Sequence, residues 1–400
     1  MFCVNSKSEF KLITGCGLNS RLGLASRLLV LVAAVSWAFS SLPVSAQSGS
    51  GTAFFKQVSE QFKAWDKDGD GVLSTNELDL AIGDVKVTGG NAAAVAALKR
   101  AQRSGRYSLP PFTLENIHVL ATNASATNFP NLGRMYAEGL RQITNAPRRE
   151  LFASGSPKLE TIHQGKLGNC FTLAPLGALV HHDPHQVERM FTALDDGTFR
   201  VALGKQSVVV APPTDAELAM TSSSEGSGVW VNLYEKAVGQ ARNDAKPLAE
   251  QSSSAIDALA RGGSAGIMLA FITGHEISRF SFKFAKDPAV SAEEQAAKIK
   301  ELKTKLMEAD RERVLMTCGT IKPTIPGITP NHAYAVLAYN ANTAEVQVWD
   351  PHGDDFKPKG EAGAEHGYPR KDGRYWIPVT EWVKQFSGMA FEVRPATTSL

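Results

Sequence analysis

Gln164-Gly-Lys-Leu-Gly-Asn-Cys170-Phe171 is the stretch that decides how this chain folds and what chemistry it can perform. It places a glutamine six residues before a cysteine, and the cysteine opens an apolar, helix-like run. The unpaired N–H groups at a helix N-terminus carry partial positive charge, which lowers the pKa of a thiol there and favours the thiolate. A side-chain amide and the backbone N–H of the cysteine can together stabilise the oxyanion on an attacked carbonyl. The stretch predicts Cys170 as a nucleophile and Gln164 as its oxyanion-stabilising partner.

A base and an orienting acid for this nucleophile lie far downstream. His332 opens an apolar, strand-like run, and a turn and an alternating second run follow over residues 340–349. This pattern predicts a hairpin in which His332 lies opposite residues 350–352. Asp350 can then accept a hydrogen bond from the imidazole and orient it. The prediction is a triad of Cys170, His332 and Asp350.

The order of these segments resembles that of a known family. Three further segments lie between the cysteine and the histidine: Trp230-Val-Asn-Leu-Tyr-Glu-Lys-Ala237, Gly262-Gly263 and Ile272-Thr-Gly274. Together with the segments of Cys170 and His332 they resemble the calpain family of papain-like cysteine proteases, over roughly residues 140 to 395. The resemblance implies an α+β, two-lobed papain-like domain, with the cysteine on a helical half and the histidine on a sheet half.

Three residues depart from the family pattern around the nucleophile and the acid. Phe171 stands where the family has tryptophan, Asp350 where it has asparagine, and His352 where it has a second tryptophan. An aspartate still accepts the imidazole N–H and stabilises imidazolium more strongly than an amide does. The aromatic cover over the histidine–acid bond is left without its tryptophan.

A second motif, far from the first, points to a metal. Asp66-Lys-Asp-Gly-Asp-Gly-Val-Leu-Ser-Thr-Asn-Glu77 fills every position of a calcium-binding EF-hand loop, and apolar residues recur at helical spacing on both sides. Calcium prefers six to eight oxygen ligands, and such a loop supplies them from carboxylates, a hydroxyl and one backbone carbonyl. The predicted Ca²⁺ ligands are Asp66, Asp68, Asp70, the carbonyl of Val72, Ser74 and Glu77.

EF-hands usually occur in pairs, and a partner is expected just after the first. Residues 91–102 and 112–120 have helical patterns, and the loop between them lacks carboxylates. We interpret this segment as a degenerate second hand that packs against the first and binds no metal.

The N-terminus has the pattern of a secretory signal peptide. Basic residues precede the apolar run Leu28–Phe39, and Val44-Ser-Ala46 is a small-x-small cleavage site before Gln47. The apolar run is too short to span a bilayer, so no stable membrane insertion is expected after cleavage. The sequence predicts a secreted or periplasmic protein that is cleaved after Ala46.

Charge and cysteine content narrow the range of partners. Residues 1–46 hold four of the 42 basic and one of the 40 acidic residues, so 38 basic and 39 acidic residues remain after cleavage. This balance offers no electrostatic footprint for nucleic acid or an anionic membrane. Only Cys170 and Cys318 remain in the mature chain, and the apolar run around Cys318 predicts a buried thiol. A protein with no evident disulfide framework therefore carries a thiol that is free for chemistry.

These features combine into one expectation for organisation and function. We expect a signal peptide over 1–46, a small all-α EF-hand domain over 47–125, a linker over 126–139 and the calpain-like α+β domain over 140–400. The predicted activity is hydrolysis of peptide bonds in a protein or peptide substrate. Two alternatives stay open: transglutaminase-like acyl transfer by the same triad, and a catalytically weak, calcium-dependent binding module.

Overall fold

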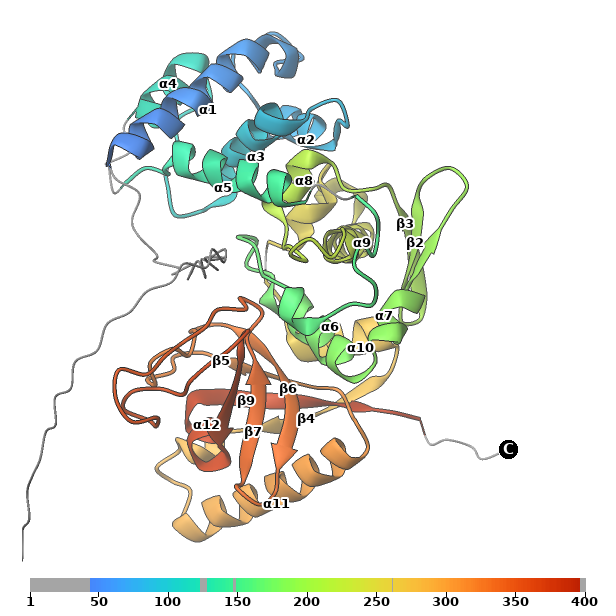
Figure 1. The fold of residues 1–400 in the computed structure, drawn as a ribbon, viewed down its shortest axis with the longest axis vertical. Coiled ribbons are helices and arrows are strands. Elements are labelled where there is room, and N and C mark those ends of the chain that lie inside the picture. Colours follow the sequence, from blue (N-terminus) through green and yellow to red (C-terminus); the bar gives the residue numbers. More distant parts are fainter. Residues whose placement is uncertain (1–43, 123–127, 147–148, 261, 396–400) are drawn as a thin grey trace, which may run out of the picture. The chain divides into compact units, whose positions relative to one another are not determined.

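The computed structural model describes residues 44–122, 128–146, 149–260 and 262–395 (Figure 1). The predicted signal-peptide core, Leu28–Phe39, lies outside the described residues. The predicted cleavage site after Ala46 lies in the first turn of helix α1, Val44–Trp65. No helix in the described ranges is both long enough and apolar enough to cross a membrane.

Two helix–loop–helix units make up the N-terminal part of the described chain. The first joins α1 to α2 (Thr75–Gly83), and the second joins α3 (Gly89–Arg103) to α4 (Leu114–Thr122). Backbone of the two loops is linked, because the N–H of Leu73 donates to the carbonyl of Phe112 over 3.1 Å. Phe54, Val58 and Leu78 are fully buried in the core between these helices. The first loop is thereby held against the second.

Helix α5, Leu132–Asn145, occupies much of the segment expected as a linker. It packs against α1, α3 and α8 (Asp215–Met220), and two glycines allow the close approach to α1 and α8. A Cβ on Gly133 would lie 2.6 Å from the backbone nitrogen of Gly51, and one on Gly139 would lie 3.1 Å from the Cβ of Ala219. The segment after Leu132 is therefore part of the packed structure.

Contacts join the N-terminal helices to residues beyond the predicted boundary. The hydroxyl of Thr214 donates to the carbonyl of Ile82 over 2.7 Å, and this threonine caps α8, Asp215–Met220. Lys99 is almost fully buried, and its ammonium lies between the carboxylates of Asp79 and Asp257. Because a buried ammonium is costly without partners, these two acids fix α3 against the chain around residue 257.

A helical region follows and carries a small sheet. One of its helices is formed by the apolar run that begins at Cys170. The sheet is a three-stranded antiparallel meander. The remaining elements of this region are α6 (Cys170–His182), α7 (Pro184–Arg189), α9 (Trp230–Asp244), α10 (Ala265–Thr273), β1 (Phe191–Ala193), β2 (Phe199–Leu203) and β3 (Gln206–Val210). Short 3₁₀ turns lie at Leu159–Thr161, Leu248–Glu250 and Ala255–Ala258.

The C-terminal region is built on a six-stranded antiparallel sheet with the order β4-β9-β5-β6-β7-β8. Its strands are β4 (Glu276–Ser281), β5 (Met316–Thr320), β6 (Ala333–Asn340), β7 (Glu345–Trp349), β8 (Arg374–Pro378) and β9 (Phe386–Val393). A 3₁₀ turn, Lys283–Ala285, follows β4, and the two helices of the region are α11 (Ala292–Arg311) and α12 (Val379–Gln385).

The two faces of this sheet pack against different helices. Side chains alternate along each strand, so Tyr334 and Val336 share one buried cluster with Leu302 of α11 and Trp382 of α12. Ala335 belongs to the other buried cluster, on the side where β6 packs against α6. The α+β prediction is confirmed, because a helical region and a mainly antiparallel sheet meet at α6.

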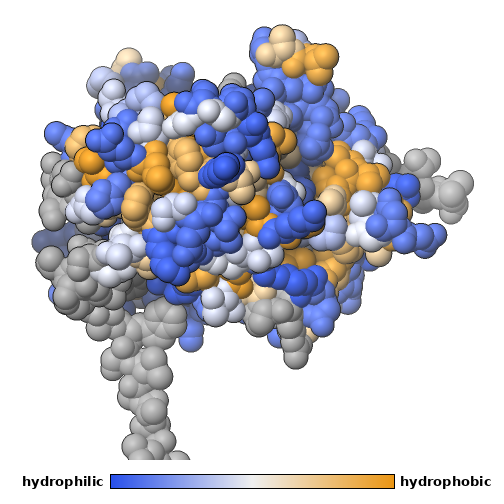
Figure 2. Space-filling view, turned by 90° about the horizontal axis from the view of Figure 1, so that it is seen from above, coloured by the Kyte–Doolittle hydropathy of each residue, from blue (hydrophilic) through white to orange (hydrophobic). Residues whose placement is uncertain are grey.

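The exposed surface mixes residue types. On the face shown in Figure 2, hydrophilic residues surround several separate groups of hydrophobic ones. Scattered exposed apolar side chains are normal on a folded protein.

Candidate active site

Cys170 is the first residue of α6, as the sequence predicts for a nucleophile at a helix N-terminus. Asn169 precedes it and is fully buried, whereas Cys170 is half-buried and lines an open cavity of about 410 Å³. Pro175 lies inside the same helix, in its second turn. The first turn therefore keeps its free N–H groups near the thiol, where their partial positive charge favours thiolate.

His332 reaches Cys170 from the sheet. It lies directly before β6, and its side chain is hydrogen-bonded to the thiol of Cys170. The other ring nitrogen, Nε2, is 2.8 Å from Oδ1 of Asp350. The imidazole thus connects the thiol to the carboxylate.

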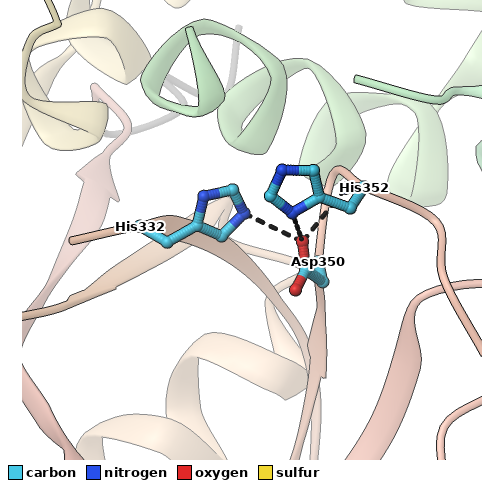
Figure 3. A group of neighbouring side chains, drawn as sticks. All are labelled: His332, Asp350 and His352. Atoms are coloured by element: carbon cyan, nitrogen blue, oxygen red, sulfur yellow. Dashed lines mark hydrogen bonds and ion pairs between the residues drawn. The ribbon is translucent and has the colours of Figure 1, made fainter. Parts of the chain in front are cut away.

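The hairpin register explains how His332 meets Asp350. Ala335 of β6 pairs with Trp349 of β7. The same register, continued by three residues, places His332 opposite His352. A bulge between Val336 and Ala338 shifts the register by one residue between the turn and this end, so His332 lies opposite His352 rather than residue 353. The predicted hairpin therefore brings His332, Asp350 and His352 together (Figure 3).

Asp350 is fully buried and accepts hydrogen bonds with both carboxylate oxygens. Oδ1 accepts from His332, and also from the backbone N–H and Nδ1 of His352, each over 3.0 Å. Oδ2 accepts from Nη1 of Arg370 over 2.7 Å and from the hydroxyl of Thr329 over 3.2 Å. Burial raises the pKa of Asp350, but the hydrogen bonds from the two histidines and their positive charge hold it well below its usual value. The carboxylate stays ionised.

Arg370 and Thr329 are functional neighbours that sequence reasoning missed. Both lie outside the strands of the hairpin, and the guanidinium of Arg370 also donates to the carbonyl of Gly327. Neither residue lies in a recognisable sequence motif, because each reaches Asp350 only when its loop folds back onto the site. The sequence shows only an arginine 20 residues after the predicted acid, and its burial becomes visible in the structure.

His352 covers the bond between His332 and Asp350. Its ring is stacked on that of His332, with centroids 4.4 Å apart and an interplanar angle of 10° (Figure 3). Tyr334 also contacts the ring of His332, in a T-shaped arrangement with centroids 5.0 Å apart. An imidazole therefore provides the flat cover that the tryptophan of the family pattern would provide.

The same three residues have ligand atoms close enough to hold a metal. One nitrogen or oxygen atom each of His332, Asp350 and His352 lies within 4.8 Å of the others. These atoms already bond one another, and the guanidinium of Arg370 lies 2.7 Å from the carboxylate. A cation here would lose these hydrogen bonds and face a buried positive charge, so the cluster fits a proton-holding role better.

The electrostatics of the pair favour a thiolate and an imidazolium. Burial raises the pKa of the Cys170 thiol, but the hydrogen bond and the positive charge of His332 bring it below its ordinary value. Burial lowers the pKa of His332, whereas Asp350 and Cys170 raise it, and the result is about 9. Between these two pKa values the thiol is ionised while the imidazole is protonated.

Gln164 is tied to the loop that carries Asp350. Its backbone N–H donates to the carbonyl of Pro351 over 2.8 Å, which fixes the start of the nucleophile stretch beside the acid. Its side-chain Oε1 is buried and has no hydrogen-bond partner among the described residues. The predicted oxyanion role would use the other end of this amide, its NH₂ group, because only that end can donate a hydrogen bond.

Glu235 holds both ends of the nucleophile stretch. This fully buried carboxylate accepts hydrogen bonds from the side chain of Asn169 and from the N–H and hydroxyl of Ser222, over 2.8 and 2.5 Å. The hydroxyl of Ser222 accepts in turn from the N–H of Gly165 over 3.2 Å. The sequence marked Glu235 only as part of a family-like helix, and its three buried donors show that it positions the residues beside Gln164 and Cys170.

Phe171 and Cys318 both have buried side chains that pack in the interior. Phe171 is buried under the guanidinium of Arg242, 4.7 Å from the ring centroid, and a Cβ on Gly263 would lie 2.6 Å from the ring. Cys318 is buried, and burial raises its pKa far above the ordinary value. Among the described residues both cysteines are free, so only Cys170 combines exposure with an activating base.

A separate oxygen-rich site lies in the loop between α1 and α2. One carboxylate oxygen each of Asp66, Asp68 and Asp70 lies within 4.8 Å of the others. Asp66 accepts hydrogen bonds from the N–H groups of Gly69 and Gly71, both of which have positive φ. The three acids therefore converge on one point of the loop.

Ser74 and Glu77 close this loop at the start of α2. Ser74 is the N-cap, and the pair forms a reciprocal capping box. The other oxygen of Glu77 accepts from the N–H groups of Lys67 and Asp68, over 2.6 and 3.4 Å. The glutamate thus connects the end of the loop to its beginning, beside the three aspartates.

Comparison with protein families agrees with the geometry. Residues 139–391, more than half of the chain, match the calpain family cysteine protease. No curated protein sequence matches the chain. The match contains α6 with Cys170, the hairpin with His332 and Asp350, and the helix with Glu235. The chain therefore belongs to the calpain family of cysteine proteases.

Proposed function

We propose that the chain is a secreted cysteine endopeptidase that hydrolyses peptide bonds with the triad Cys170, His332 and Asp350. The observation that carries this proposal is the continuous hydrogen-bonded chain from the half-buried thiol through the imidazole to a buried, ionised carboxylate. The thiol lines an open cavity, so a peptide can reach it.

The first half of the reaction forms an acyl-enzyme. The Cys170 thiolate attacks the peptide carbonyl carbon, a C–S bond forms, and the carbonyl electrons move to oxygen. The Cys170 N–H and the Gln164 amide stabilise this oxyanion. The His332 imidazolium then gives its proton to the leaving nitrogen, and the C–N bond breaks.

Water completes the cycle. Neutral His332 takes a proton from a water molecule, whose oxygen attacks the thioester carbonyl, and the C–S bond breaks. The products are a carboxylic acid and a thiolate that is again paired with imidazolium. Asp350 keeps the imidazole oriented throughout and remains ionised, because its other oxygen is bonded to Arg370.

The products of a digestion in heavy-oxygen water test this proposal. We expect casein fragments whose new C-termini carry the heavy oxygen, also in the presence of an added primary amine. Fragments that carry the amine as an amide would instead show acyl transfer. Peptide binding that needs calcium but gives no fragments would show a binding module.

We also propose that the loop of residues 66–77 binds Ca²⁺. The support is its donor set, which consists of hard oxygens, and the convergence of three carboxylates at a loop closed by Glu77. The ion would supply charge neutralisation among these acids. Its ligands would be Asp66, Asp68, Asp70, the Val72 carbonyl, Ser74 and Glu77.

Replacing Glu77 with glutamine is expected to weaken calcium binding about 100-fold. The change removes one negative charge and one of two equivalent oxygens, while the side chain keeps its size. Isothermal titration calorimetry with calcium measures the effect. Glu60→Gln, an equal change at an exposed position of α1, is the control and should bind normally. Equal affinity of the Glu77→Gln variant would place the calcium site elsewhere.

Secretion is proposed from the N-terminal sequence. The basic segment, the short apolar run and the small-x-small site before Gln47 support export and cleavage. N-terminal sequencing of protein recovered outside the cytoplasm should begin at Gln47, and an intact N-terminus there would contradict the proposal.

A further inference from the structure

The cavity beside Cys170 has a floor of small residues. Pairing in the sheet aligns Ser281 of β4, Gly388 of β9, Gly319 of β5 and Ala333 of β6 in one row across four strands. All four line the cavity. A row without large side chains leaves room for an extended peptide next to the thiol.

The next row on the same face carries a charge at its edge. Arg279 of β4 pairs with Ala390 of β9, which pairs with Thr317 of β5. Residues two apart on a strand face the same side, so this row continues the floor, and its three residues also line the cavity. Of the lining residues, all within the described chain, Arg279 is the one with a permanent charge.

No acid of the described residues neutralises Arg279. The acid on the same face of β9, Glu392, lies two residues beyond Ala390 and is already paired with His275 at 2.7 Å and Arg394 at 2.9 Å. The thiolate–imidazolium pair adds no net charge to the cavity. The cleft is therefore positive, and its guanidinium is exposed and available.

We propose that Arg279 makes this cleft select substrates with an aspartate or glutamate close to the scissile bond. The inference rests on the proposed peptidase function and adds the substrate class. A guanidinium binds a carboxylate through charge-assisted hydrogen bonds, often two in parallel. It repels the lysine or arginine of a basic peptide, which gives selectivity by both attraction and repulsion.

Two peptides that differ only in glutamate or lysine at one position test the proposal. Mass spectrometry of the cleavage of a peptide library first identifies the position at which acidic residues are enriched. For wild-type protein we expect kcat/KM about tenfold higher with glutamate there. Arg279→Lys should keep the preference, and Arg279→Glu should reverse it. The position is exposed on an edge strand, so these variants should fold, which melting curves check.

A matched control separates local from global charge effects. Lys286→Glu changes the net charge equally, lies at an exposed position outside the cavity, and should leave the preference unchanged. Equal kcat/KM for both peptides with wild type and Arg279→Glu would overturn the inference and leave peptidase function intact.

Complete absence of hydrolysis would overturn the proposed function instead, and binding would then decide the inference. Two fluorophore-labelled peptides, identical except that one has glutamate and the other lysine at the same central positions, are titrated with the Cys170→Ala variant. Tighter binding of the glutamate peptide, lost when Arg279→Glu is added, supports the inference. Equal binding of both peptides overturns it.

Discussion

Cys170→Ala is expected to lower peptide hydrolysis by roughly 10⁴-fold or more, to the level of the background reaction. The variant loses the sulfur that His332 activates, the only one beside this imidazole in the described part of the chain, so no acyl-enzyme can form. Casein cleavage followed by mass spectrometry measures the effect. The fold should persist, because Cys170 is only half-buried and its replacement is small.

Cys318→Ala is the matched control for this variant. Cys318 is buried in the sheet core, and burial raises its pKa far above the ordinary value, so it supplies no thiolate. Cys318→Ala should keep kcat/KM within a few-fold of wild type and change only stability. Normal turnover in Cys170→Ala, or loss of turnover in a folded Cys318→Ala, would move the nucleophile away from α6.

Asp350→Asn is expected to lower kcat/KM by about 100-fold, although the family pattern has asparagine at this position. The pocket around Asp350 contains donors on both sides. Whichever way the new amide turns, its NH₂ faces either His332 and His352 or Arg370 and Thr329. A buried arginine without its carboxylate should also cost about 3 kcal/mol of folding stability, measured by urea unfolding.

The pH profile separates the loss of activation from mere instability. In the wild type, activity should rise as Cys170 ionises, below the ordinary pKa of a thiol, and fall as His332 loses its proton near its pKa of about 9. Removal of the Asp350 charge takes away one of the two groups that raise the pKa of His332, so the alkaline fall should move to lower pH. Asp354→Asn, an exposed acid of the same loop, is the control. An unchanged profile in Asp350→Asn would mean that the carboxylate does not tune the base.

Local patterns were sufficient to predict the elements that carry the site. The alternation before and after residues 340–343 predicted a hairpin, although the register that pairs Ala335 with Trp349 depends on both the short turn and the bulge between Val336 and Ala338. The apolar run after Cys170 predicted a helix that begins at that residue. Both signals are periodic and local, which is why they are readable without a structure.

The surroundings of the site could not be predicted, because they depend on contacts between distant segments. Arg370 reaches Asp350 from a loop 20 residues away, and Glu235 reaches Asn169 across 66 residues. Asp257 completes the partners of Lys99 from the other side of the predicted domain boundary. Each is a single charged residue whose partner is brought to it only by tertiary folding. The stacking of His352 on His332 could not be predicted either, because the sequence shows only that a histidine replaces the tryptophan of the family pattern.

The central claim is that His332 holds Cys170 as a thiolate. Its most direct test is the rate at which iodoacetamide alkylates Cys170, measured at several pH values by mass spectrometry of the peptide that contains Cys170. We expect rapid labelling of the wild type that persists well below pH about 8.5, the ordinary pKa of a thiol. In His332→Ala, the labelling rate should follow the pH dependence of an ordinary thiol. The same pH dependence in wild type and His332→Ala, with its midpoint at the ordinary value, would contradict it.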